Sequence, residues 1–233
     1  MGAISRSRIR ARIDALNIAG DVRRIRLTLD DPFRFYAGQY LFVVHPSGPR
    51  IPFSIASGPH RLPELELHFR PIAGNDDAVL VNELLIPRSM LILDGPHGDV
   101  HVATSTTRPL WLIAGGTGVS QALAIASFLA TCAQRAPVRL VWSVTHRTDL
   151  YCEGDLRALE KRHWFRCTPV IDVPGDSTNA AVRFIDRHRD EIPDDARILI
   201  CGGPGFVRSV ADALAARGIA RPRLESDMFS YGT

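Results

Sequence analysis

The chain has 233 residues, of which 45% are hydrophobic and 23% charged, and its formal net charge is +3. A chain of this length forms one large domain or two of about a hundred residues each. So small a charge argues against nucleic-acid binding, and no apolar run reaches the roughly twenty residues of a membrane helix. The eight histidines are scattered without metal-ligand spacing. We therefore expect no nucleic-acid partner, no membrane span and no metal.

The first part of the chain, residues 1–102, has the pattern of an antiparallel β-barrel or sandwich. Short runs with alternating apolar positions are separated by Pro and Gly, which is typical of antiparallel barrels and sandwiches. Two such runs are Ile25, Leu27 and Leu29, and Leu65, Leu67 and Phe69. The next residues, 103–109 (ATSTTRP), are small and polar and end in proline. They predict a linker between two domains.

The second part of the chain, residues 110–233, alternates strands with helices and predicts a doubly wound α/β domain with a parallel sheet. Strands are expected near residues 110–114, 138–144, 166–171, 196–201 and 223–226. Helices are expected near residues 119–133, 149–161, 178–189 and 205–217.

A glycine turn follows the first predicted strand of this domain. Gly115, Gly116, Thr117 and Gly118 separate an apolar strand from a helix start. Glycines let the backbone approach a ligand closely, and the free N–H groups at a helix N-terminus attract anions such as a pyrophosphate. The turn is not the G-x-G-x-x-G fingerprint of dinucleotide-binding folds, and glycines at such a turn also serve packing alone.

A second turn of the same kind follows the strand at residues 196–201. Cys201 ends the strand, and Gly202, Gly203, Pro204 and Gly205 lead into a helix that begins near Phe206. Because ligands of open α/β sheets bind outside the carboxyl ends of the strands, both turns are expected at one crevice. The alternative for Cys201 is a small apolar side chain that fills a buried strand end.

The cysteines indicate neither disulfides nor an iron–sulfur cluster. Cys132, Cys152, Cys167 and Cys201 have no close spacing and no ferredoxin-like pattern, so this chain is expected to carry no cluster of its own. No apolar signal-peptide core follows Met1. Reduced cysteines and a cytoplasmic location are therefore expected.

Five motifs resemble the ferredoxin–NADP reductase superfamily in their order along the chain. They are residues 35–40 (FYAGQY), 51–57 (IPFSIAS), 95–98 (GPHG), 115–118 (GGTG) and 201–206 (CGGPGF). The short chain is most similar to the NAD(P)H:flavin oxidoreductases, whose Gly-Asp-Ala-Phe ending resembles this chain at Asp227 and Phe229. Ser226 and Met228 depart from that ending.

The resemblance implies a flavin-binding barrel followed by an NAD(P)-binding α/β domain, with hydride transfer from nicotinamide C4 to flavin N5 between them. Ser54, near flavin N5, and Cys201, beside the nicotinamide, are the implied catalytic residues. The implied flavin-binding residues are Arg50, Pro52, Phe53, Ser54, Ile55, Ala56, Asp227 and Phe229. The implied NAD(P)-binding residues are Gly115, Gly116, Thr117, Gly118, Cys201, Gly202, Gly203, Pro204 and Phe206. Without the resemblance, the Ser54 hydroxyl would be interpreted as capping its own turn.

The chain departs from the superfamily where the flavin phosphate is bound. Ile51 stands in place of the phosphate-binding Arg, and the adjacent Arg50 is expected on the opposite face of the strand. Residues 74–78 (GNDDA) place two carboxylates at the second phosphate contact, where they are better suited to the positive end of a helix. Losing one charge-assisted contact weakens FMN binding by about ten- to a hundredfold.

Weak phosphate contacts favour a dissociable flavin, whether FMN, FAD or riboflavin, that leaves in reduced form for a monooxygenase or another electron acceptor. One alternative is a reductase component with bound FAD or FMN that passes electrons to a partner protein such as an oxygenase. Another is a non-catalytic, nucleotide-binding regulatory module. The cofactor is NADH or NADPH. Thr145 stands where relatives often have an Arg for the 2′-phosphate, and this favours NADH unless Arg147 folds back to serve.

Overall fold

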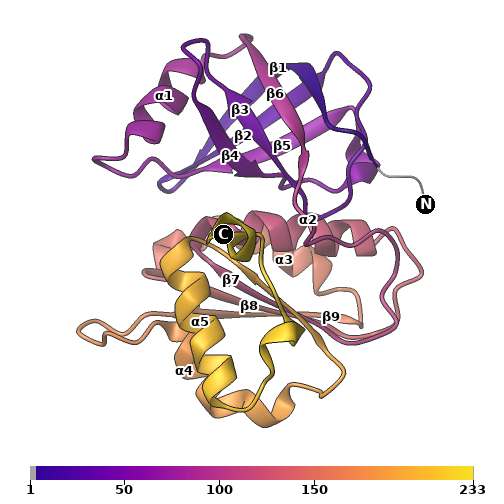
Figure 1. Cartoon of the computed structure of the whole chain (residues 1–233), viewed down its shortest axis with the longest axis vertical. Helices are drawn as coiled ribbons and strands as arrows, with labels where there is room; N and C mark the ends of the chain where they lie inside the picture. Colours follow the sequence, from indigo (N-terminus) through magenta and orange to yellow (C-terminus); the bar gives the residue numbers. More distant parts are fainter. Residues whose placement is uncertain (1–3, 233) are drawn as a thin grey trace.

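The computed structural model describes residues 4–232, with side chains described up to residue 229. A β-barrel lies on one side of the molecule and a parallel sheet with its helices on the other (Figure 1). Both expected sheets are therefore present, and the predicted fold class is confirmed.

The barrel is built from six antiparallel strands in the order β4-β3-β6-β1-β2-β5. Their bounds are β1 Ser7–Ala19, β2 Val22–Leu29, β3 Tyr40–Val44, β4 Arg50–Ser54, β5 Glu64–Phe69 and β6 Met90–His97. A bridge between Ile55 and Leu67 joins the end of β4 to β5, and the N–H of Ala56 donates to the carbonyl of Glu66 at 2.8 Å. These contacts close the sheet into a barrel.

Alternating side chains explain the two faces of the barrel strands. In β1 the arginines at positions 8, 10 and 12 are exposed, whereas Ile9, Ala11 and Ile13 between them are buried inside the barrel. Helix α1, Asp76–Leu84, lies between β5 and β6 in the chain, and the Asn75 side chain caps it by accepting the N–H of Ala78. Asp76 and Asp77 occupy its first turn, where their negative charge complements the positive helix end.

The second sheet is parallel and has the strand order β11-β10-β7-β8-β9. Its strands are β7 Leu110–Gly115, β8 Val138–Val144, β9 Phe165–Ile171, β10 Arg197–Cys201 and β11 Leu224–Glu225. The helices are α2 Val119–Leu129, α3 Glu153–Leu159, α4 Ala180–His188 and α5 Pro204–Ala216. Two separate apolar clusters show that α2 and α3 cover one face of the sheet, and α4 and α5 the other.

Two helices are shorter than the sequence predicts. The helix expected over 119–133 ends at Leu129, because the next residues form a tighter turn in which Thr131 and Cys132 donate to carbonyls three residues back. The helix expected over 149–161 begins only at Glu153. Ahead of it, residues 147–149 form a separate 3₁₀ turn that His146 and Asp149 cap reciprocally.

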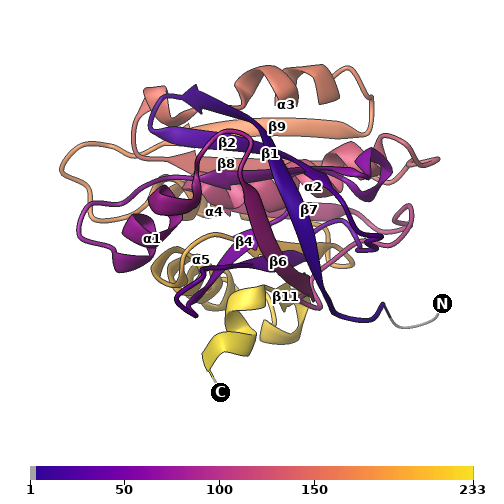
Figure 2. The same cartoon turned by 90° about the horizontal axis from the view of Figure 1, so that it is seen from above.

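Helix α2 lies between the barrel and the parallel sheet (Figure 1), and the view from above shows the barrel stacked over the α/β part (Figure 2). Ala37 and Val102 from the barrel half belong to the same apolar cluster as the buried face of α2. The two halves therefore share part of one core. The expected linker, residues 103–109, falls between β6 and β7, and its role as the domain boundary stays a prediction. Over residues 4–232, no helix is long and apolar enough to span a membrane.

Candidate active site

Strand β4 forms the barrel wall of the candidate site. Ile51 and Phe53 are buried in the barrel core, whereas Pro52 is exposed and Ser54 is half-buried. This alternation follows from the strand geometry, in which successive side chains point to opposite faces. Pro52 and Ser54 thus face the α/β half of the molecule.

The two glycine turns form the opposite wall, and they touch each other. An added Cβ at Gly118 would overlap the carbonyl oxygen of Cys201, so the first turn has no room for a side chain there. The ring of Phe206 packs against Gly115, where an added Cβ would lie 2.6 Å from the ring. The ends of β7 and β10 are therefore held together by close backbone contact.

Two cavities lie between these walls. One has a volume of about 280 Å³ and the other about 420 Å³, and both are lined by Pro52 and Ser54 from the barrel and by Gly202 and Gly203 from the second turn. Phe53, Thr117 and Gly118 also line the smaller cavity, and Asp227 lines the larger. The structure thus brings residues from four distant segments of the sequence to one crevice.

Asp227 lies at the crevice in a polar cluster that joins the two halves of the molecule. The side-chain amide of Gln121 donates to the Asp227 carboxylate at 2.9 Å and to the carbonyl of Gly38 in the barrel at 2.7 Å. Burial raises the pKa of Asp227 from about 3.8 to about 6, although the hydrogen bonds from Gln121 and the Val100 backbone oppose this rise.

Cys201 lies behind the crevice. It is 2% exposed, and burial raises the pKa of its thiol well above the ordinary value, with the charge of Asp227 adding to the rise. Since the thiolate is the nucleophilic form of cysteine, Cys201 is a neutral thiol at pH 7 and is not suited to nucleophilic chemistry.

Arg50 does not line either cavity. Its guanidinium pairs with Asp94 at 2.8 Å and lies 4.3 Å from the centre of the Phe42 ring. Among the described residues that line the two cavities, Arg70 is the only Arg or Lys. Arg70 itself pairs with Asp149 at 3.1 Å and with Asp21 at 3.4 Å.

The other residues that the sequence singled out lie around the crevice without lining the two cavities. Ile55 and Ala56 are buried at the end of β4, Gly116 begins the first turn, and Pro204 is the first residue of α5. Phe229 is 40% exposed in the last turn of the chain. Their proposed contacts with ligands stay predictions.

Sequence reasoning missed Gln121, His68 and Arg70. Gln121 is a buried polar residue on the apolar helix α2, and this mismatch is a signal that sequence reasoning could have used. His68 on β5 and Arg70 just after the end of that strand line the smaller cavity. Their role depends on the docking of the two halves, which no local pattern reports.

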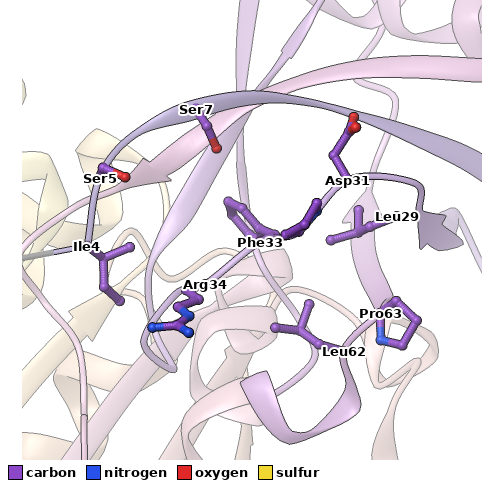
Figure 3. A pocket seen from close by; sticks show the side chains of 10 residues that line it. Ile4, Ser5, Ser7, Leu29, Asp31, Phe33, Arg34, Leu62 and Pro63 are labelled. Carbon is purple, nitrogen blue, oxygen red and sulfur yellow. The ribbon is translucent and has the colours of Figure 1, made fainter.

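A larger cavity of about 700 Å³ lies elsewhere, in the barrel half of the molecule (Figure 3). It is lined by residues such as Phe33, Asp31 and Arg34, and it includes none of the residues predicted for the site. In the described part of the chain, no group of three or more His, Cys, Asp or Glu side chains is placed to hold a metal ion.

Comparisons with known proteins place this architecture in a class of two-domain oxidoreductases. The oxidoreductase NAD-binding domain family matches residues 112–212. A probable flavin reductase of Photobacterium leiognathi is 30% identical over 221 residues, which cover 90% of this chain and 93% of that protein. Reductase component 2 of a Comamonas sp. terephthalate 1,2-dioxygenase is 26% identical over 98% of this chain and 70% of its own length.

Among solved structures, the Amycolatopsis cytochrome P450 reductase GcoB superposes with a TM-score of 0.83 at 27% identity, covering 97% of this chain and 70% of that one. The Plasmodium falciparum ferredoxin-NADP+ reductase superposes with a TM-score of 0.81 at 14% identity, covering 94% and 95%, and this second likeness concerns the fold alone. The chain belongs to the ferredoxin–NADP reductase superfamily, and flavin reductases are among its relatives within it.

Proposed function

We infer that this protein is an oxidoreductase that reduces flavin with NAD(P)H. The observation that carries this function is the crevice in which Ser54 of the barrel faces Gly203 of the second glycine turn, since both residues line both cavities. Such a crevice offers an apolar strand on one side and helix N-termini, which attract anions, on the other. The similarity to a flavin reductase along most of the chain supports the same function.

The crevice is proposed to take two flat rings together with their phosphate groups. An added Cβ at Gly116 or Gly203 would meet no atom within 4 Å, so the backbone of both turns is open to a ligand. A bound flavin supplies an N5 atom that accepts the hydride from nicotinamide C4. The contribution of the protein is to hold the two rings in contact, because positioning supplies most of the rate in such a transfer.

On the flavin side, we assign ring binding to Pro52, Phe53 and Ser54, with the backbone of Ile55 and Ala56 continuing the wall. The Ser54 hydroxyl is proposed to hydrogen-bond the N5 edge. Asp227 and Phe229 are proposed to border the flavin from the end of the chain. Arg50 is also assigned to the flavin side, and its guanidinium pairs with Asp94 at 2.8 Å.

On the nucleotide side, the pyrophosphate is assigned to the first turn, where helix N-terminal amides are available. The second turn and Cys201 are assigned to the nicotinamide, with the neutral thiol acting by its shape. The proposed residues are Gly115, Gly116, Thr117, Gly118, Cys201, Gly202, Gly203, Pro204 and Phe206. Thr145 is exposed after β8, and the lack of an Arg there favours NADH over NADPH.

The flavin is proposed to be a dissociable substrate. Among the described residues that line the two cavities of the crevice, Arg70 is the only Arg or Lys, and it already pairs with two carboxylates. Asp77 lines the same cavity as Arg70. A flavin phosphate therefore gains little attraction there. We expect riboflavin, FMN and FAD all to be accepted, and reduced flavin to pass to a free acceptor such as a monooxygenase.

The second candidate is a reductase with bound flavin that passes electrons to an oxygenase or a ferredoxin. It is favoured by the match with the Comamonas dioxygenase reductase component, which extends over 98% of this chain. This role requires the partner to reach the flavin edge directly.

The test is NAD(P)H oxidation by desalted protein, followed by nicotinamide absorbance with and without added riboflavin. Activity that is absent without riboflavin and saturates with it is the expected result. Activity in a yellow, desalted sample without added flavin would support the second candidate. A protein that binds the nucleotide and oxidises none of it under either condition would be the non-catalytic module, and flavin reduction would be rejected.

A further inference from the structure

A line of hydrogen bonds crosses from the barrel to the α/β half beside the crevice. Arg24 on β2 donates to Glu66 on β5 at 2.6 Å, and Glu66 also contacts Nε2 of His68 at 2.8 Å. Nδ1 of His68 lies 2.8 Å from the hydroxyl of Tyr151, which belongs to the α/β half. The His68 side chain is fully buried, so each of its ring nitrogens needs its partner.

The direction of these bonds follows from the charges. Burial alone would raise the pKa of Glu66, but the bonds from His68 and Arg24 lower it to about 2, so Glu66 is a carboxylate and accepts. In the neutral ring, Nε2–H of His68 therefore donates to Glu66 and Nδ1 accepts from Tyr151. Burial raises the pKa of Tyr151 well above 10 and keeps its O–H group as the donor.

The line continues from Tyr151 to the first glycine turn. The ring of Tyr151 packs edge-on against Trp142, with 5.7 Å between the ring centres. The indole N–H of Trp142 donates to the carbonyl of Gly116 at 2.9 Å. In a trans peptide the carbonyl and the next N–H point in opposite directions. Fixing the Gly116 carbonyl therefore fixes the direction of the Thr117 N–H, and Thr117 lines the smaller cavity.

We propose that His68, Tyr151 and Trp142 are positioning residues through which the barrel sets the orientation of the nucleotide-binding turn at Gly116. The inference rests on the proposed function, because it assigns the nucleotide pyrophosphate to that turn. None of the three side chains is required to touch the reacting atoms. They act through the direction of one peptide bond.

The same strand also contacts the proposed flavin wall. β5 carries Glu66 and His68, and it is joined to the end of β4 by the Ile55–Leu67 bridge and by the bond from Ala56 to Glu66. One strand is thus linked to the flavin side through β4 and to the nucleotide side through Tyr151. This arrangement ties the spacing of the two rings to a single element of the barrel.

The test is the affinity of flavin-free protein for ADP-ribose, which carries the pyrophosphate and lacks the nicotinamide, measured by isothermal titration calorimetry. We expect Tyr151→Phe to raise the Kd about fivefold, the equivalent of one ordinary hydrogen bond. Trp142→Phe, which removes the donor to Gly116, is expected to raise it about tenfold. Because both act through the same carbonyl, the double variant should bind no more weakly than Trp142→Phe alone.

Asp155→Asn is the matched control. Asp155 on α3 accepts from Arg24 at 2.7 Å across the same interface, but this branch does not lead to the glycine turn. The Kd of Asp155→Asn for ADP-ribose is expected to stay within about twofold of the parent value, since the variant loses only one partly exposed ion pair. Thermal unfolding of every variant confirms that it is folded at the temperature of the titration.

Two results would overturn the proposal. Parent-like affinity in Tyr151→Phe and Trp142→Phe would show that the line does not orient the turn. An equal loss in Asp155→Asn would show a general loosening of the interface. If the parent itself fails to bind ADP-ribose, the nucleotide site of the proposed function is rejected together with the inference. In the first two cases the proposed function stands.

Discussion

The carboxyl group of Asp227 is buried, and burial favours its protonated form. Its pKa of about 6 in the folded protein exceeds the ordinary value near 3.8. A carboxyl with a raised folded pKa stabilises the native state below its unfolded pKa and loses that contribution as pH rises toward its folded pKa. The loss between about pH 4 and pH 6 amounts to at most about 3 kcal/mol.

We therefore expect Asp227→Asn to change how stability depends on pH. In urea unfolding followed from pH 4 to pH 7, the parent should lose stability relative to the variant as pH rises, and the difference should level off above about pH 6. Asparagine keeps the size of the side chain and can still accept a hydrogen bond from Gln121. A constant difference over the whole range would show that Asp227 titrates normally.

The glycines of the two turns serve different purposes. Some leave room for neighbouring backbone, and others leave room for a ligand. Gly118 has the carbonyl of Cys201 against it, whereas Gly203 faces open space at the start of α5. The two glycines are close in the structure and identical in chemistry. They therefore make a matched pair of substitution sites.

Gly118→Ala is expected to destabilise the protein by about 1–3 kcal/mol, because β7 and β10 must move apart to admit the methyl group. Gly203→Ala is expected to leave the urea midpoint within experimental error and to weaken nucleotide binding or turnover, because its methyl group enters the crevice. Urea unfolding and NAD(P)H oxidation measured on both variants check this. Unchanged activity in a folded Gly203→Ala protein would contradict the assignment of the nicotinamide to the second glycine turn.

Secondary structure was largely predictable from local patterns. The alternation of Ile25, Leu27 and Leu29 predicted β2, and all three side chains are buried. Helix α5 was predicted near residues 205–217, with Pro204 in the break before it. The helix begins one residue earlier, at Pro204, because proline suits the first turn of a helix. The lengths of α2 and α3 were overestimated, because the turns that follow Leu129 and precede Glu153 are set by backbone bonds rather than by apolar periodicity.

The candidate site was only partly predictable from the sequence. The resemblance pointed to the crevice between Ser54 and the glycine turns, and the structure brings them together. Gln121 was missed, although its polar side chain on the apolar helix α2 was a signal. His68 and Tyr151 were not predicted, because their contact crosses the two halves of the molecule. A contact of this kind depends on how two independently patterned segments dock, and it leaves no periodic trace in either one.

The shared core also predicts how the molecule unfolds. Ala37 and Val102 pack with α2, and polar bonds such as His68–Tyr151 add to this interface. The three tryptophans, at positions 111, 142 and 164, all belong to the α/β half. We expect tryptophan fluorescence, which reports that half, and far-UV circular dichroism, which reports both, to give coincident urea transitions. A circular dichroism curve with two steps would show that the halves unfold separately.

Strand β9 lies at the edge of the parallel sheet, and its outer side is closed to further strands. The N–H of Cys167 donates to the side chain of Glu160, Pro169 has no N–H, and the carbonyl of Ile171 accepts from Arg183. An open edge is a template on which another chain can add and start aggregation. Because three successive outward positions are occupied or lack a donor, we expect this edge to resist the addition of a sixth strand from another chain.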